Sequence, residues 1–221
     1  MRILIIGLLA LQLCTWSAEA VAGEAPRARQ APVVDGTPDD VAWNQGDWVE
    51  LQYSIIGTNP TSEDFSGRYK VVWTPEFLYV LAEITDDVLV DSTANPLKSY
   101  WNDDTLEFFV DEDASGGDHH KNDNAYAYHV ALDNQVVDIG PDGAPALYPT
   151  HVVAAWKRDL AHPHRVYWEA RIAVYGEGAD TARKLTENET LGFMLAYCDA
   201  DTANGRDHFF GDVEIDPVNG D

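Results

Sequence analysis

The sequence predicts an all-β fold, an antiparallel β-sandwich of the jelly-roll or immunoglobulin-like type. Several short segments alternate apolar and polar side chains, which is the period of strands with one buried face. Turn-forming residues separate these segments, and only residues 178–187, GADTARKLTE, are expected to form a short helix. With 221 residues and 45% hydrophobic content, the chain has the size and composition of one such domain.

The N-terminus indicates export. An apolar run over residues 3–13 follows a basic residue and precedes small residues suited to cleavage. This run is shorter than the ~20 apolar residues that a spanning helix needs. We therefore expect residues 1–22 to be a signal peptide, residues 23–31 a polar lead-in, and residues 32–221 the domain of a secreted or periplasmic protein without membrane insertion. An uncleaved anchor and a lipid attached at Cys14 are the alternatives.

The net charge limits the classes of partner that the protein can bind. The formal net charge is −24, and a surface that carries it repels phosphate backbones and anionic lipids. Nucleic acid is therefore excluded as a partner, whereas neutral ligands and divalent cations remain.

Once the signal peptide is removed, Cys198 is the only cysteine, so the exported domain is expected to hold together without an internal disulfide.

The predicted strands follow one another in chain order. The clearest are RYKVVW and LYVLAEITDD, two strands joined by a Pro-containing turn within residues 68–87. The same alternation predicts further strands within residues 99–113, 125–133, 151–156, 166–174 and 191–197. Trp168 shares its parity with Val166 and Ile172, so we place its side chain in the core.

One of these stretches, SYWNDDTLEFFVDED over residues 99–113, presents a large aromatic and a carboxylate together. Leu106 and its alternate neighbours form the apolar face, so Glu107 points away from the core, and Trp101 has the same parity as Glu107. In the next predicted strand, AYAYHVALD, His129 also points away from the apolar face. A shared polar face is therefore expected on these two strands.

In their order, these segments resemble the family 9 carbohydrate-binding modules. The matching pieces are VVDGTPDDVAW, VVWTPEFLYVLAEITDD, YWNDDTLEFFVDED, VYWEARIAV and LGFMLAYCDADTANGRD, within residues 32–210. The resemblance implies a non-catalytic β-sandwich that binds neutral saccharide, often at the reducing ends of plant polysaccharides, with structural Ca²⁺. It also implies a glycoside hydrolase as partner in polysaccharide breakdown.

The resemblance assigns the family's stacking tryptophan to Trp101 and its sugar-binding glutamate to Glu107. A pyranose ring has an apolar face and a rim of hydroxyls, so a binder needs a flat aromatic and fixed polar groups. Both residues reach one sugar only if the loop before Asp104 folds back, because an extended strand separates them by roughly 20 Å. The family's arginine falls on His129, which keeps a hydrogen-bond donor but loses the bidentate fork. Further polar positions of the family fall on Ala131, Ala196 and Cys198.

Each of these assignments has an ordinary structural alternative. Trp101 is a packing residue in the first alternative, and His129 is a solvated strand residue in the second. The family pattern also continues past residue 221 into a loop with a second sugar-facing tryptophan and a closing strand. The resemblance therefore implies a sandwich that lacks its last strand, an unpaired edge near Asp212 and Glu214, and binding near millimolar. The alternative to a domain that lacks its last strand is that the sequence is a fragment of a longer protein.

Two acidic loops are candidates for structural calcium. DEDASGGDHHKNDN places Asp111 and Asp113 as in an EF-hand loop, but Asn122 stands where that loop needs a bidentate glutamate. DADTANGRD offers Asp199 and Asp201. Oxygen-rich loops suit Ca²⁺, so these four carboxylates are the predicted ligands, with a solvated acidic turn as the alternative.

Two other classes of function use residues of this chain. A glycoside hydrolase would need paired carboxylates such as Asp212, Glu214 and Asp216, which alternate in DVEID. A haem-binding periplasmic redox sandwich would need axial ligands such as His129 and Met194, although the chain has no CxxCH motif. All of these are also ordinary strand residues, so saccharide binding without catalysis is the predicted function.

Overall fold

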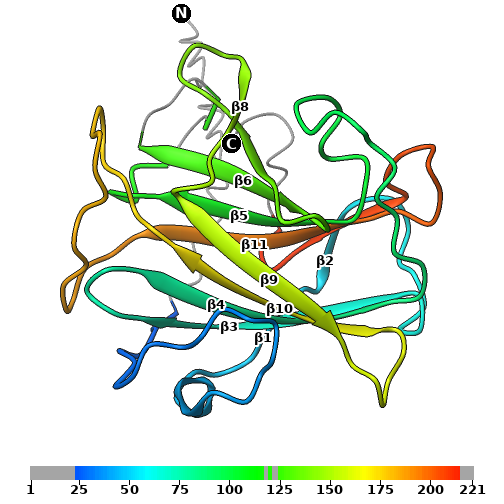
Figure 1. The fold of residues 1–221 in the computed structure, drawn as a ribbon, viewed down its shortest axis with the longest axis horizontal. Helices are drawn as coiled ribbons and strands as arrows, with labels where there is room; N and C mark the ends of the chain where they lie inside the picture. The colour runs from blue at the N-terminus through cyan, green and yellow to red at the C-terminus, as the bar shows by residue number, and fades with distance from the viewer. Residues whose placement is uncertain (1–22, 117–118, 121–123, 215–221) are drawn as a thin grey trace, which may run out of the picture.

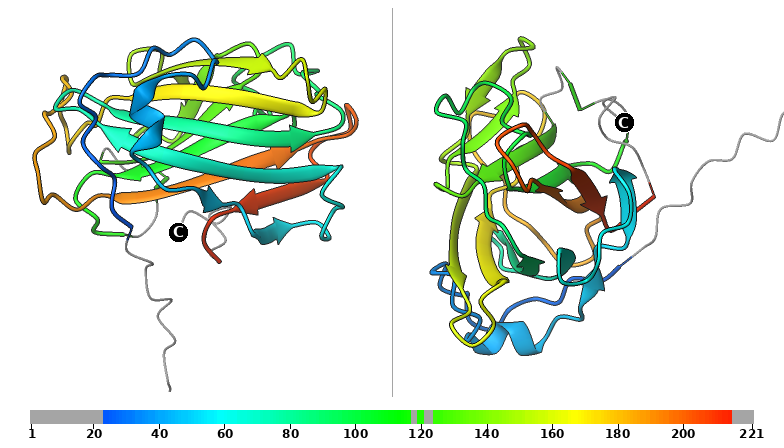
Figure 2. Two further views of the ribbon diagram at one scale, coloured as in Figure 1. Left: turned by 90° about the horizontal axis from the view of Figure 1, so that it is seen from below. Right: turned by 90° about the vertical axis from the view of Figure 1, so that its right-hand side faces the viewer.

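A computed structural model describes residues 23–116, 119–120 and 124–214 of the chain. The described residues form a sandwich of two antiparallel sheets that pack face to face (Figures 1 and 2). The predicted all-β antiparallel sandwich is therefore confirmed. No helix of the described residues has the length and apolar character to cross a membrane.

The two sheets differ in width. The five-stranded sheet has the order β1-β3-β4-β10-β9, and the seven-stranded sheet has the order β2-β12-β11-β5-β6-β7-β8. The strands of the first are β1 Val49–Glu50, β3 Phe65–Trp73, β4 Leu78–Asp86, β9 Val152–Arg158 and β10 Arg165–Ile172. The strands of the second are β2 Tyr53–Ile56, β5 Thr105–Asp111, β6 Ala125–Ala131, β7 Val136–Ile139, β8 Pro145–Leu147, β11 Gly192–Asp199 and β12 His208–Gly211.

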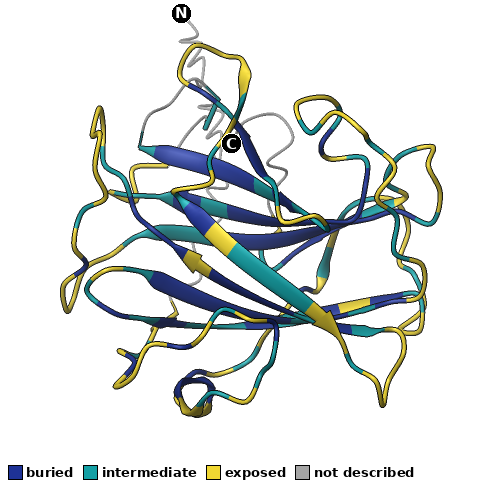
Figure 3. Cartoon of the chain, viewed as in Figure 1, coloured by how far each residue is buried: buried dark blue, intermediate teal, exposed yellow. Residues whose placement is uncertain are grey.

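The core lies between the sheets, where alternate residues of each strand meet (Figure 3). Trp168 on β10 is 1% exposed, as its parity predicts. Across the core, Phe65 of β3 stacks on Tyr197 of β11 with ring centroids 5.5 Å apart. The fully enclosed aliphatic residues include Ile84, Leu106, Val130, Val166, Ile172 and Leu195. These inward faces fix the direction of the remaining side chains, which point outward from each sheet.

The N-terminal segment covers the outer face of the five-stranded sheet. Residues 23–31, the predicted lead-in, reach the edge of β3, where the amide of Ala28 donates to the carbonyl of Trp73 at 2.8 Å. The 3₁₀ turn η1 Val41–Asn44 then buries Trp43, whose indole donates to Glu169 at 2.8 Å. The outer face of the seven-stranded sheet carries Glu107 and His129 among small and apolar side chains.

Two sequence-based expectations about local structure are wrong. Residues 178–187 form no helix, because long-range contacts fix the segment in an irregular course with turns at both ends. Leu185 is buried, its amide donates to the carbonyl of Pro75, and Arg183 pairs with Glu112 at 2.6 Å. The expected unpaired edge near Asp212 is also absent among the described residues, since β12 pairs with both β11 and β2. The question of a closing strand falls on residues 215–221, outside the described ranges.

His151, in the segment that joins β8 to β9, is expected to make stability fall in acid. Its ring stacks on Tyr175 at 3.7 Å, and burial lowers its pKa from 6.5 to about 4. The unfolded chain therefore binds the proton first as the pH falls, so stability is lost between pH 6.5 and about 4. Thermal unfolding of wild type and His151→Gln from pH 7 to 4 checks this. The stability difference between them should shrink in acid, and a constant difference would contradict the assignment.

Candidate functional site

The outer face of the seven-stranded sheet brings the predicted polar residues together. Antiparallel register places Glu107 of β5 directly opposite His129 of β6 and opposite Ala196 of β11. The neighbouring outward positions are small or apolar: Phe109, Ala127, Ala131, Met194 and Cys198. One carboxylate and one imidazole therefore stand side by side on an otherwise weakly polar surface.

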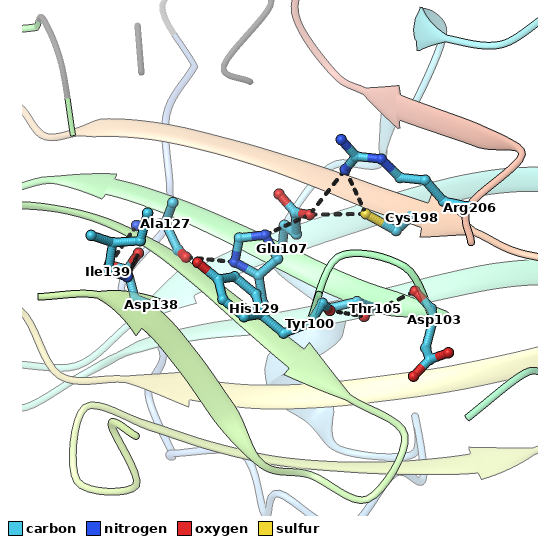
Figure 4. A network of polar contacts seen from close by, with 10 residues as sticks. All are labelled: Tyr100, Asp103, Thr105, Glu107, Ala127, His129, Asp138, Ile139, Cys198 and Arg206. Carbon is cyan, nitrogen blue, oxygen red and sulfur yellow. Dashed lines mark hydrogen bonds and ion pairs between the residues drawn. The ribbon is translucent and has the colours of Figure 1, made fainter. Parts of the chain in front are cut away.

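Glu107 lies at the centre of a contact network (Figure 4). Its Oε1 accepts a hydrogen bond from Cys198 Sγ at 2.9 Å and lies 2.9 Å from His129 Nε2. Nη1 of Arg206 lies 3.1 Å from the same sulfur and 3.8 Å from Oε1. Although it points outward, Glu107 is only 2% exposed, because these neighbours enclose it.

The charges of the network support one another. Burial alone would raise the pKa of Glu107, but the charge and hydrogen bonds of His129, with Cys198 and Arg206, hold it below its usual value. Burial would lower the pKa of His129, yet Glu107 and the nearby Asp138 raise it. Each group therefore favours the charged form of the other, a carboxylate beside an imidazolium. Glu107 is a fixed hydrogen-bond acceptor in this site.

Trp101 lies beside this network but not in the strand that the sequence predicts for it. β5 begins at Thr105, and residues 99–102 form a turn with Ser99 at φ 48°. The turn folds back over the sheet, so that Tyr100 meets the His129 ring edge-on at 4.6 Å and Trp101 meets Tyr100 edge-on at 4.9 Å. Trp101 is 39% exposed and is the only aromatic among the strongly exposed residues of the described chain.

The space under this turn is too small for a sugar. A cavity of about 20 Å³ is lined by Thr93, Tyr100, His129 and Val137, among others. That volume holds about one water molecule. A saccharide would therefore bind on the outer surface near Trp101 and not in this cavity.

A second polar group lies at one end of the sandwich, on the right in Figure 1. Asp86 ends β4, Asp104 precedes β5 and Asp199 ends β11, and their carboxylate oxygens lie within 4.8 Å of one another. All three residues are buried. A neighbouring cluster, more exposed, is formed by Asp64, Asp87 and Asp201.

The buried triad has the chemistry of a cation site. Burial raises the pKa of Asp86, Asp104 and Asp199. The oxygens accept hydrogen bonds from the Val88 and Ala200 amides and from the Tyr197 hydroxyl, among others, but these donors are neutral. Among the described residues, the only basic side chain within ion-pair distance of the triad is His208, 3.0 Å from Asp199. Three clustered oxygen donors with this shortage of positive charge fit a hard divalent cation such as Ca²⁺.

The predicted metal residues separate into two groups. Asp199 and Asp201 each enter one of the two carboxylate clusters. Asp111 and Asp113 enter neither: Asp111 accepts from the Gly116 amide at 2.7 Å and Asp113 from the Ser115 amide at 3.1 Å. Among the residues that the structure describes, those two carboxylates stabilise a turn.

The structure does not support the sites of the two rival functions. Among the described residues β12 ends at Gly211, and Asp212 accepts from the Tyr69 hydroxyl at 2.6 Å and the Leu195 amide at 3.1 Å. The third acid of DVEID, Asp216, lies outside the described ranges. For haem, His129 lacks a free ring nitrogen, because Nδ1 lies 2.9 Å from the carbonyl of Ala127 and Nε2 contacts Glu107.

Comparison with known proteins agrees with this architecture. The family described as carbohydrate family 9 binding domain-like matches residues 34–219. Endo-1,4-beta-xylanase A of Thermotoga maritima is 31% identical over 121 residues, 55% of this chain and 11% of the xylanase. Endo-1,4-beta-xylanase A of Thermoanaerobacterium saccharolyticum is 34% identical over 104 residues, 47% of this chain and 8% of the xylanase. The matched part is thus about a tenth of each relative.

Solved structures share the fold. A family 9 carbohydrate-binding module from Caldicellulosiruptor kristjanssonii in complex with glucose has a TM-score of 0.65 at 23% identity, over 85% of this chain and 83% of its own. The structure of such a module from the same organism with cellotriose gives 0.63 at 24% identity, over 85% and 82%. The chain therefore belongs to the carbohydrate family 9 binding domain-like family, and residues 34–219 are a non-catalytic carbohydrate-binding domain.

Proposed function

We propose that the domain binds neutral, gluco-configured plant-type saccharides on the outer face of the seven-stranded sheet. The observation that carries this proposal is an exposed Trp101 that is linked through Tyr100 and His129 to the enclosed Glu107 carboxylate. The indole offers a flat apolar surface to a pyranose face, and the carboxylate accepts from a hydroxyl on its rim. The glucose and cellotriose in the similar solved structures support this class of ligand.

The same proposal covers the setting of the domain. The xylanases that share this segment support a role in polysaccharide breakdown beside a glycoside hydrolase. The N-terminal signal-like sequence supports a secreted or periplasmic location. A single exposed aromatic among the described residues supports weak binding, with a dissociation constant near millimolar.

Titration with cellotriose and xylotriose tests the proposed function. Nuclear magnetic resonance detects binding at millimolar concentration, and glucuronic acid serves as the charged comparison. Saturable binding of the neutral oligosaccharides is expected. Failure of both neutral ligands to bind a folded protein would contradict the proposal.

Trp101→Ala is expected to weaken cellotriose binding while the fold persists. Removal of a stacking aromatic costs about 1–3 kcal/mol of binding free energy, which is roughly ten-fold or more in affinity. Trp48→Ala is the matched control, since Trp48 contacts Arg68 and Lys70 beside the five-stranded sheet. Titration and circular dichroism of both variants check this. An unchanged affinity in folded Trp101→Ala would exclude Trp101 as the sugar platform.

We also propose that Ca²⁺ is a structural cofactor held by Asp86, Asp104 and Asp199. The burial, spacing and uncompensated charge of these carboxylates support this assignment. The ion would neutralise repulsion where β4, β5 and β11 meet, next to the turn that carries Trp101. Calcium bound there would therefore stabilise the fold and the loops around the saccharide site.

A further inference from the structure

Arg206 reaches the saccharide face from the loop that joins β11 to β12. Its guanidinium lies over the ring of Phe209, with Cζ 4.6 Å from the ring centroid. The side chain is 12% exposed, and Nη1 contacts both Cys198 and Glu107. Contacts on two sides therefore hold a cation beside the sugar-facing carboxylate (Figure 4).

The contacts of Arg206 and Glu107 leave part of each group unused. The contacts of the carboxylate with Cys198, His129 and Arg206 all fall on Oε1, and Oε2 accepts no hydrogen bond from any described residue. On Arg206, Nη1 makes the polar contacts, while Nη2 and Nε have no partner among the described residues. A guanidinium has five N–H donors, so several remain to be satisfied by water or by a ligand.

We propose that Arg206 is a saccharide-contacting residue that determines specificity together with Glu107, an inference that rests on the proposed function. Oε2 of Glu107 accepts from one ring hydroxyl, and the free N–H groups of Arg206 donate to its neighbour. An acceptor beside a donor matches two adjacent hydroxyls of a pyranose, each of which both donates and accepts. The loop between β11 and β12 thus contributes to a site otherwise built from strands.

His129 positions the Glu107 carboxylate in this arrangement. Its two ring nitrogens are engaged by the carbonyl of Ala127 and by Oε1 of Glu107. Tyr100 covers the ring edge-on. His129 is therefore a positioning residue that fixes the carboxylate, and the donor for the sugar comes from Arg206.

The same pair favours neutral sugars over acidic ones. The carboxylate of a uronic acid would be drawn to Arg206 but would meet Oε2 of Glu107 in the same contact. The net charge of −24 adds a long-range repulsion. A hydroxyl satisfies both groups, because it donates to the oxygen and accepts from the guanidinium.

The contact between Arg206 and a sugar hydroxyl is tested by comparing the affinities of wild type and a variant for glucose and for its monodeoxy analogues. The probes are glucose and its 2-, 3-, 4- and 6-deoxy analogues, titrated against wild type and Arg206→Gln by nuclear magnetic resonance. Arg206→Gln is expected to bind glucose about ten-fold or more weakly, because a charge-assisted hydrogen bond is lost. One deoxy sugar, which lacks the hydroxyl that Arg206 contacts, should bind both proteins equally.

Two further variants separate contact from folding. Arg171→Gln is the matched control, because Cζ of Arg171 lies 4.9 Å from the ring centroid of Phe77 on the five-stranded sheet. This variant should leave glucose binding unchanged. Arg206→Lys keeps the charge without the fork and should lie between wild type and Arg206→Gln. Melting curves establish that each variant is folded.

The outcomes distinguish this inference from the proposed function. If Arg206→Gln binds glucose as tightly as wild type does, Arg206 does not contact the sugar and the inference is overturned. Glucose binding by the wild type would still support the proposed function. An equal loss for glucose and every deoxy analogue also overturns it, because Arg206 would then act only by positioning Glu107. A wild type that binds neither glucose nor cellotriose overturns the proposed function and the inference with it.

Discussion

Chelation of metal-replete protein with EDTA at pH 8 is expected to lower the melting temperature by about 5–10 °C. A cation that binds only the folded state at a hundred times its dissociation constant adds about 2.7 kcal/mol to the free energy of unfolding. For a domain of this size, each kcal/mol shifts the melting temperature by about 2–4 °C. Differential scanning calorimetry with and without EDTA measures the shift.

The effect of chelation should decrease as the pH falls towards 5. Burial raises the pKa values of Asp86, Asp104 and Asp199, so the metal-free folded state holds protons that the unfolded chain has already released. The contribution of these three carboxylates to the stability of the metal-free protein is therefore greatest in mild acid and is lost as the pH rises through their raised pKa values. Calcium and protons compete for the same oxygens, so calcium contributes most at alkaline pH.

Variants of two acidic residues locate the site. Asp86→Asn is expected to remove the sensitivity to EDTA and to make the metal-free protein more stable than metal-free wild type at pH 8. The side-chain oxygen of the asparagine still accepts from the Val88 amide, and its NH₂ group donates to the Tyr197 oxygen in place of the bond that this hydroxyl donates to Asp86. Asp111→Asn is the control and should keep the sensitivity. Equal melting of calcium-loaded wild type with and without EDTA would contradict bound structural calcium.

Glu107→Gln is expected both to destabilise the domain and to abolish most saccharide binding. Removing one partner of a buried ion pair costs about 3–5 kcal/mol of the free energy of unfolding, because Arg206 keeps its charge and the buried His129 loses the carboxylate that favours its charged form. The saccharide loses its charged acceptor, so affinity should fall about ten-fold or more. Chemical denaturation and cellotriose titration measure the two effects.

Glu169→Gln is the matched control for this variant. Glu169 is also buried and outward-pointing, but on the five-stranded sheet, where the Asp35 and Gly36 amides and the Trp43 indole occupy both of its oxygens. Its substitution should lower stability and leave saccharide affinity unchanged. Full affinity in folded Glu107→Gln would show that Glu107 does not contact the ligand.

The strands were predictable because their side chains alternate. Val166, Trp168 and Ile172 share one parity in the sequence and one buried face in β10. Residues 178–187 were not predictable in the same way, because contacts with distant residues such as Pro75 decide their course. Local helical preference is weak beside the burial of Leu185.

The candidate site was predictable only in part. The pairing of Glu107 with His129 follows from strand parity and register, whereas Arg206 comes from a loop whose course no periodicity reveals. The carboxylates of Asp86 and Asp104 flank predicted strands, and ends of neighbouring antiparallel strands meet at one edge of a sandwich. The position of these carboxylates at strand ends could therefore have predicted the cluster of Asp86, Asp104 and Asp199. Nothing local distinguishes Asp111, which caps a turn, from Asp199, which joins a cluster.

The most direct test of saccharide binding on the seven-stranded sheet is a titration of ¹⁵N-labelled protein with cellotriose, observed at the indole N–H groups. Trp101 lies on the proposed face, while Trp43, Trp48 and Trp73 lie on or beside the five-stranded sheet. The indole signal of Trp101 and the Nε–H signal of Arg206 should shift together and saturate. Shifts confined to Trp43, Trp48 or Trp73 would contradict the proposed site.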